Sequence, residues 1–136
     1  MANIDVALDV RNFSNSTPGF ESYTNSTSNT GVEYCYRYTG GTDGNGDVTE
    51  YTGQGAATVT VSVTGNFSCN VYNVEFEGDP AGELSWTWGN IPQNNIAIIA
   101  DADTSNEDGY YSVIVQDLTQ SNTTIPCDPK ITTKPP

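Results

Sequence analysis

The sequence predicts an all-β fold, a two-sheet antiparallel β-sandwich of about seven or eight strands in an immunoglobulin-like or jelly-roll arrangement. Apolar and polar residues alternate over many short segments, which is the period of a strand with one buried face. These segments are also rich in β-branched and aromatic residues. Gly and Asn recur every few residues, which weakens any helix, and no segment has a helical period. A closed barrel is the alternative architecture.

The first half of the chain contains three predicted strands. Residues 4–11 alternate between aliphatic side chains and mostly acidic or small ones. Residues 32–38 place Val32 and three tyrosines on one face, with Cys35 between charged side chains on the other. Residues 58–64 alternate valine with threonine and serine. Each pattern predicts one face in the core and one face in solvent.

The second half predicts further strands. Residues 84–88 and 111–116 alternate in the same way. Residues 96–100 are apolar on both faces, so this segment is expected in the middle of a sheet or beneath a loop. Residues 130–133 predict an additional strand near the C-terminal end of the sequence.

A change of phase within residues 67–76 predicts a β-bulge. The apolar face runs first through Phe67, Cys69 and Val71, and then moves by one residue to Tyr72, Val74 and Phe76. Because side chains alternate with a period of two, such a shift requires an extra residue in the strand.

The chain is expected to form a single domain over residues 1–136, with long polar loops at about 12–30 and 40–56. The first loop is rich in Ser, Thr and Asn, and the second is rich in Gly. Loops of this length in a compact domain are either functional or disordered. The strands at both ends of the sequence are expected to be sheet edges, so the strand that starts at Ile4 could add to a neighbour's sheet.

The charge balance excludes some classes of function. Asp and Glu number 17 against 4 Lys and Arg, giving a formal net charge of -13, and the chain has no His. A chain with so few basic groups has no face for nucleic acid or anionic lipid. Without His there is no Ser-His-Asp triad and no imidazole metal ligand. No apolar run approaches the ~20 residues of a membrane span, so membrane insertion is not expected.

An acidic loop is a candidate calcium site. Asp43, Asn45 and Asp47 alternate in a Gly-rich segment, and calcium prefers such oxygen ligands. The spacing resembles the start of an EF-hand-type loop. It departs from that pattern at Val48, where the family has Gly, and at Gln54, where it has Glu. The alternative is a flexible hairpin turn, which an Asn-Gly dipeptide favours.

A second acidic segment offers further candidate ligands, Asp101, Asp103 and Asp108. It follows the apolar segment 96–100, and its first carboxylates alternate in the same way. The alternative here is a polar loop with an Asp-Gly turn before a strand. Both loops could share an ion if they lie at one end of the sandwich, so Ca²⁺ is a candidate ligand and no cofactor is required.

The three cysteines leave the redox chemistry open. Cys35 is on the polar face of its predicted strand, Cys69 is on an apolar face, and Cys127 lies in the tail. An odd number means that at least one stays reduced or pairs with another molecule. The three hypotheses are three reduced thiols, one intrachain bridge, or an intermolecular bridge. Cys127 is the best candidate for the last, because termini are accessible.

Trp86 and Trp88 are two residues apart, so they share a face of their strand. They are either a pair of core residues or a platform for stacking on sugar rings. The candidates for paired catalytic carboxylates are Glu75, Glu77, Asp79 and Glu83, near the two tryptophans. A solvated strand face and turn explains these residues better, and a chain of this size offers little room for a deep cleft.

We therefore expect no enzymatic activity. The expected function is that of a structural or adhesive protein, which self-assembles or decorates a cell, filament or virion surface. A carbohydrate-binding, lectin-like module is the alternative, so the expected partners are a second copy, a protein surface or a glycan. Extracellular or surface-exposed localisation is favoured by the polar uncharged composition, and a cytoplasmic one stays open because no signal peptide precedes the first strand.

Overall fold

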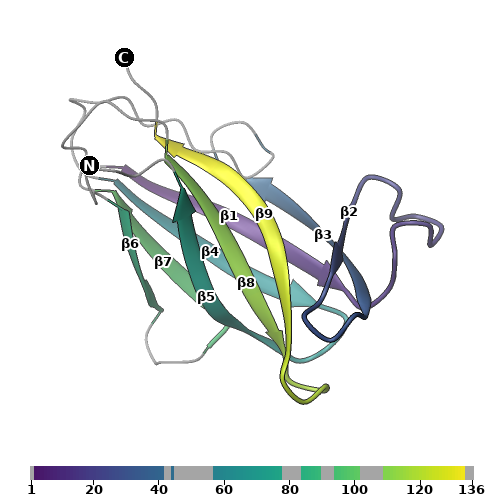
Figure 1. Cartoon of the computed structure of the whole chain (residues 1–136). Coiled ribbons are helices and arrows are strands. Elements are labelled where there is room, and N and C mark those ends of the chain that lie inside the picture. Colours follow the sequence, from purple (N-terminus) through teal and green to yellow (C-terminus); the bar gives the residue numbers. More distant parts are fainter. Residues whose placement is uncertain are drawn as a thin grey trace.

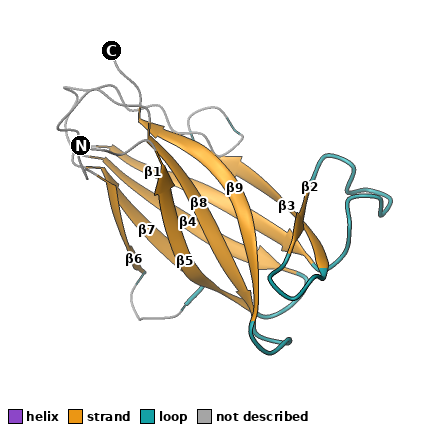
Figure 2. Ribbon diagram, in the orientation of Figure 1, coloured by secondary structure: helices purple, strands orange, loops and turns teal. Residues whose placement is uncertain are grey.

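The computed structural model describes residues 2–41, 44, 57–77, 84–89, 94–101 and 109–133, which form nine strands in two sheets. The strands are β1 (Ala2–Arg11), β2 (Thr24–Thr27), β3 (Glu33–Gly40), β4 (Ala57–Gly65), β5 (Cys69–Glu77), β6 (Leu84–Trp88), β7 (Ile96–Asp101), β8 (Gly109–Asp117) and β9 (Thr123–Thr133). A six-stranded sheet has the order β2-β3-β1-β4-β7-β6, and a three-stranded sheet has the order β5-β8-β9 (Figure 1). The predicted all-β class in two sheets is confirmed (Figure 2).

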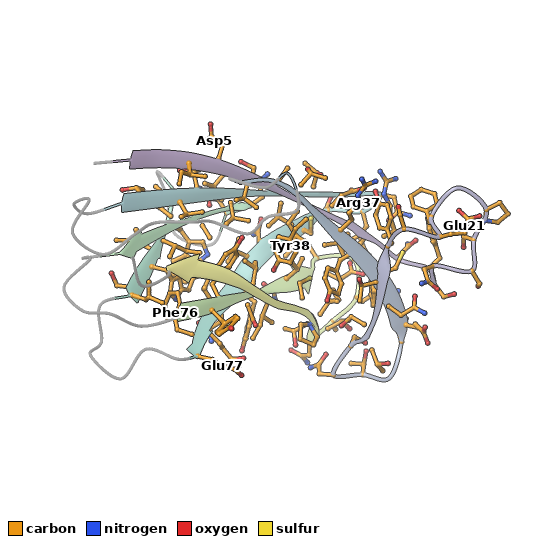
Figure 3. The ribbon with its side chains drawn as sticks, turned by 90° about the horizontal axis from the view of Figure 1, so that it is seen from above. Asp5, Glu21, Arg37, Tyr38, Phe76 and Glu77 are labelled. Carbon is orange, nitrogen blue, oxygen red and sulfur yellow. The ribbon has the colours of Figure 1, made fainter. Side chains whose placement is uncertain are left out.

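The core lies between the two sheets and is built from the alternating residues. Each side chain in it is at most 4 % exposed: Val6, Leu8, Val10, Tyr34, Tyr36, Tyr38, Val59, Val61, Val63, Val71, Val74, Ala97, Ile99, Tyr111, Val113, Val115, Ile125 and Cys127. Figure 3 shows Tyr38 between the sheets, whereas Asp5 and Glu77 point away on opposite outer faces. The strand period therefore identified the inward side of the main strands. Two residues expected on apolar faces, Val32 and Tyr72, are instead exposed, at 43 % and 53 %.

The prediction of a wholly antiparallel sandwich is wrong for one pair of strands. β1 pairs antiparallel with β3 but parallel with β4, so that Val6 lies opposite Val61. The chain between β1 and β4 contains β2, β3 and residues 41–56, which exceeds the dozen or so residues that a parallel connection needs. The six-stranded sheet is consequently mixed.

The N-terminal strand is not an edge strand, contrary to the prediction. β1 lies between β3 and β4 in the middle of the six-stranded sheet, with a neighbour on each side. The edges of that sheet are β2 and β6, and those of the smaller sheet are β5 and β9. The C-terminal strand is therefore an edge as expected, but β1 cannot add to a neighbour's sheet.

The predicted bulge is present in β5. The pairing of β5 with β8 shifts between Val71 and Asn73. Val71 and Val74 are both buried, and Tyr72 between them is 53 % exposed. The position of the phase change is confirmed, but Tyr72 points to solvent rather than joining the apolar face, because it is the extra residue of the bulge.

Two strands differ in extent from the prediction. β2 lies within the loop predicted at 12–30, where its sequence TNST has no apolar alternation to reveal it. β9 begins at Thr123, well before the predicted strand at 130–133. β7 lies between β4 and β6, which confirms the interior position inferred from its two apolar faces.

Residues 12–23 form a folded segment beside the outer face of β1 and β3. Phe13, Phe20 and Tyr23 pack edge to face, with ring centroids 4.8 and 5.0 Å apart. The Arg11 guanidinium lies 5.3 Å from the centroid of the Phe20 ring. This part of the predicted loop is ordered by its own small aromatic cluster, the arrangement that defines a compact surface loop.

In the described part of the chain, no helix is long and apolar enough to cross a membrane.

Candidate functional site

The two tryptophans lie on the inner face of β6, which is an edge strand of the six-stranded sheet. Trp86 and Trp88 are partly buried and pack against the core. Their ring centroids are 4.8 Å apart, and the ring planes meet at 68°. The Trp88 indole Nε1 donates a hydrogen bond to the carbonyl oxygen of Val71, 2.9 Å away. The two rings are therefore edge to face, and they do not form one continuous flat surface.

Trp88 joins the two sheets along one side of the core. Val71 belongs to β5, the edge of the smaller sheet, and its N–H donates to the carbonyl oxygen of Asn94, at 2.8 Å. The Asn94 side chain is held in turn by a hydrogen bond to the carbonyl of Gly89 and by one from the Ile96 N–H. We call this side the aromatic margin and define it by Val71, Trp86, Trp88 and Asn94.

Polar groups join the two sheets on the opposite side, where the outermost strand β2 meets β9. The Ser26 Oγ donates to the carbonyl oxygen of Pro126 at 2.5 Å. Asn29 bonds Thr124 twice, its N–H donating to the Thr124 carbonyl at 3.1 Å and its Oδ1 accepting from the Thr124 N–H at 2.8 Å. We call this side the polar margin and define it by Ser26, Asn29, Thr124 and Pro126. The proline also lacks a donor, which protects the β9 edge.

A buried carboxylate connects the sheets near one end of the core. Asp117 is 2 % exposed, and its Oδ2 accepts a hydrogen bond from the Tyr34 hydroxyl at 2.6 Å. Its Oδ1 accepts from both the N–H and the hydroxyl of Thr119. Burial, together with the hydrogen bond to Asp117, raises the pKa of Tyr34 far above its ordinary value. The phenol is therefore neutral and serves as a donor in this bond.

A second tyrosine connects the sheets in the centre of the core. The Tyr38 hydroxyl donates to the carbonyl oxygen of Cys127 at 3.2 Å and accepts from the N–H of Val113 at 3.3 Å. Burial raises the pKa of Tyr38 well above its ordinary value, and neighbouring Cys127 adds to the shift. Both tyrosines thus lie in a predicted apolar stripe, but their hydroxyls bond across to the other sheet.

A third cluster of ionisable groups lies on the outer face. The Asp9 carboxylate pairs with the Arg11 guanidinium at 3.0 Å and accepts a hydrogen bond from the Tyr23 hydroxyl at 2.5 Å. Burial and the bond to Asp9 raise the pKa of Tyr23. These contacts hold residues 12–23 against the end of β1. Their chemistry is that of a structural anchor.

The cysteines are placed differently from the sequence-based expectation. Cys35 points to the outer face as predicted, yet it is 0 % exposed. Burial raises the pKa of its thiol, with a further contribution from nearby Asp9. Cys69 is partly buried and packs against the core. Both are free thiols.

The expected accessibility of Cys127 is wrong. The residue lies within β9, and its side chain is 0 % exposed. Its thiol lies 3.9 Å from the carbonyl oxygen of Ile125, to which it donates. A bridge from Cys127 to another molecule would require β9 to move. The pairing of the cysteines remains a prediction.

The candidate calcium ligands fall largely outside the described residues. Asp43, Asn45, Asp47, Asp103 and Asp108 all lie outside them. Asp101 ends β7, where the structure describes only its backbone. Among the side chains that the structure describes, no three acidic or cysteine groups gather as metal ligands. The calcium site thus remains a prediction.

Two of the candidate catalytic carboxylates do not face the tryptophans, and the other two, Asp79 and Glu83, lie outside the described residues. Glu75 and Glu77 are exposed on the outer face of β5, as expected for a solvated strand. Trp86 and Trp88 face the core from β6. The structure therefore separates these two groups, which sequence reasoning had considered together.

Sequence reasoning missed the residues that connect the sheets. Tyr34 and Tyr38 were expected to be either core residues or part of an aromatic stacking surface, without bonds across the core, and Asp117, Ser26 and Asn29 were not singled out. A tyrosine in an otherwise aliphatic strand face is the signal that could have found the first two, because a buried phenol needs a hydrogen-bond partner. Asp117 continues the inward alternation of β8, so a carboxylate in an apolar phase was a signal for it as well. Ser26 and Asn29 lie in polar segments without a distinctive pattern.

No known family model matches the chain, and a comparison with curated proteins finds no match.

Proposed function

We propose that the protein is a non-catalytic structural or adhesive protein that self-assembles or decorates a cell, filament or virion surface. Its setting would be extracellular or surface-exposed. In this proposal, the two sheets belong to a sandwich of the immunoglobulin-like or jelly-roll kind. The broad core between two face-to-face sheets supports that class.

One observation supports the structural role most strongly. Three buried or half-buried side chains with polar atoms make hydrogen bonds that connect the two sheets. Tyr34 and Tyr38 bond across the core, and Trp88 bonds across the aromatic margin. Strongly perturbed titratable groups cluster at active sites in enzymes, but structural networks perturb pKa values as well. Here the perturbed tyrosines belong to such networks.

The experiment is light scattering on a size-exclusion column with the full chain. It is run from ~10 µM to ~1 mM, because association follows mass action, with and without Ca²⁺ and with and without reductant. A mass that rises with concentration supports self-assembly. If assembly depends on Ca²⁺, the acidic segments are the sites that organise it. If assembly depends on oxidation, a disulfide between subunits holds it together. A monomer under every condition would overturn self-assembly and favour a binding module.

A carbohydrate-binding module is the second candidate, and the partial exposure of the two tryptophans favours it. The proposed ligand is a sugar ring stacked on Trp86, since the Trp88 N–H already bonds Val71. Tryptophan emission should shift on adding the glycan that binds, and Trp86→Ala should abolish the shift. Blue-shifted emission that resists a soluble quencher would exclude this candidate.

A further inference from the structure

The outer face of the six-stranded sheet changes in chemistry between β1 and β4. On β4, Thr60 and Ser62 alternate with fully buried valines and therefore point outward. On the far edge, Ser85 and Thr87 of β6 are exposed. β7 runs between these strands and presents Ile96 and Ile98 to the same face, since Ala97 and Ile99 are in the core. We call these six residues the neutral face.

Pairing in the sheet brings these side chains together. Ile98 lies opposite Thr60 of β4 on one side and opposite Thr87 of β6 on the other. Ile96 lies opposite Ser62. The neutral face is thus a central row of isoleucine flanked by two rows of small hydroxyl side chains. These side chains form one continuous surface, because the three strands are neighbours in the same sheet.

The neutral face has no ionisable group in a strongly acidic chain. None of the described outward-facing side chains of β4, β6 and β7 is ionisable, although the formal net charge is -13. The acidic surface begins on the next strand, where exposed Asp5 lies opposite Thr60. The other outer face of the molecule carries Glu75 and Glu77 on β5. Figure 3 shows Glu77 on that face.

We propose that the neutral face binds a second copy of this chain, face to face about a two-fold axis. This inference rests on the proposed function and names its contact surface. Two acidic chains repel each other, and that repulsion is weakest when the surfaces brought together carry no carboxylates. A basic partner would be drawn to the acidic strands instead. A two-fold axis also suits the surface, since each isoleucine row would meet its counterpart.

The size of the neutral face determines how strongly two copies of the chain are expected to bind each other. Its six side chains are far fewer than the roughly 20–30 residues that each partner contributes to a standard stable interface. The dimer is therefore weak, and it forms chiefly where the local concentration is high. A protein that covers a surface in many copies meets this condition, because tethering raises effective concentration.

The test is analytical ultracentrifugation of the full chain and of two matched variants. Ile98→Glu places a carboxylate in the centre of the neutral face. Ser112→Glu places the same charge on the outer face of β8, in the other sheet. We expect the wild-type chain and Ser112→Glu to associate alike, and Ile98→Glu to associate at least ~10-fold more weakly, because each new carboxylate meets its symmetry mate.

A salt series gives a second readout. Added salt should strengthen the association of the wild-type chain, because it screens the repulsion between two acidic chains and leaves the uncharged contact intact. Association that weakens with salt would mean ion pairing and would overturn the inference.

The remaining outcomes separate the inference from the proposed function. If Ile98→Glu associates as strongly as the wild type, the neutral face is not the contact surface, although the proposal of self-assembly still stands. A wild-type chain that never associates would overturn both. Ile98→Thr guards against misfolding, because it keeps a β-branched residue on the strand. This variant should fold like the wild type and associate more weakly, owing to its lost apolar area.

Discussion

The aromatic and polar margins perform the same task with different chemistry. Each joins an edge of the three-stranded sheet to the six-stranded sheet without a continuous strand ladder. At the aromatic margin a half-buried indole packs on the core and donates one bond. At the polar margin, Ser26 and Asn29 make exposed bonds to β9. Burial of apolar area contributes more than an exposed hydrogen bond. The comparison teaches that two sheets can be held together along one side by bonds that add little to the stability of the fold.

The largest expected effect tests the aromatic margin. Trp88→Ala removes a ring that packs on the core and should lower the free energy of unfolding by about 3 kcal/mol. Urea denaturation followed by circular dichroism measures it. Trp88→Phe is the matched control, which keeps a ring but removes the bond to Val71, and it should cost about 1 kcal/mol. A loss below ~1 kcal/mol for the alanine variant would show that this margin carries little apolar stabilisation.

The second-largest expected effect tests a buried hydrogen bond. It shows whether burial, rather than the type of group, determines how much such a bond contributes to the stability of the fold. Tyr34→Phe removes a single hydroxyl, which leaves the buried carboxylate of Asp117 with fewer donors, so it should cost about 2 kcal/mol. Urea denaturation at neutral pH measures this loss. If the variant is as stable as the wild type, Tyr34 contributes to stability through the packing of its ring alone, and its bond to Asp117 adds nothing.

Alkaline denaturation tests the bond between Tyr34 and Asp117 in a second way. Burial and the bond to Asp117 raise the pKa of Tyr34 in the folded state, so the unfolded phenol loses its proton first. Stability is then fully present below the ordinary tyrosine pKa of about 10 and falls as the pH rises above it. We expect Tyr34→Phe to show a shallower fall than the wild type. Equal slopes would argue that other groups, such as Tyr38, dominate alkaline unfolding.

The smallest effects belong to the polar margin. Asn29→Ala removes the exposed side-chain bonds to the backbone of Thr124 and Asn122 and should cost about 1 kcal/mol. Ser26→Ala should cost about 0.5 kcal/mol. Amide hydrogen exchange gives a local readout, with faster exchange at the Thr124 N–H in the Asn29 variant. A cost near that of Trp88→Ala would remove the distinction between the two margins.

Local patterns in the sequence predicted what depends on neighbours along the chain. Alternation identified the inward residues of the main strands, and the phase change located the bulge beside Tyr72. The order of strands within a sheet depends on distant pairing, so periodicity could not show that β1 lies between β3 and β4. β2 escaped prediction because a short polar strand at an edge needs no apolar face.

The candidate site was predictable only in part. Trp86 and Trp88 share a face as their spacing requires, but which partner receives the indole N–H depends on the fold. Cys35 shows the limit most clearly. Its strand face is outward, yet it is fully buried, and it lies opposite Arg11 of β1 on one side and Asn25 of β2 on the other. Nothing in the sequence indicated β2, so the period alone predicted an exposed thiol. Cys127 was misplaced because a tail was expected where the chain forms a paired strand.

The central position of β1 has a consequence for how the chain folds while it is being synthesised. β1 is synthesised before both of its partners. It gains β3 as its antiparallel neighbour early, but its parallel partner β4 follows only after residues 41–56. Until then, the nascent chain exposes one side of its innermost strand. Contacts between distant residues slow folding and lengthen the lifetime of such open edges. The acidic side chains on β1, Asp5 and Asp9, would act as gatekeepers during this interval by discouraging contact with neighbouring nascent chains.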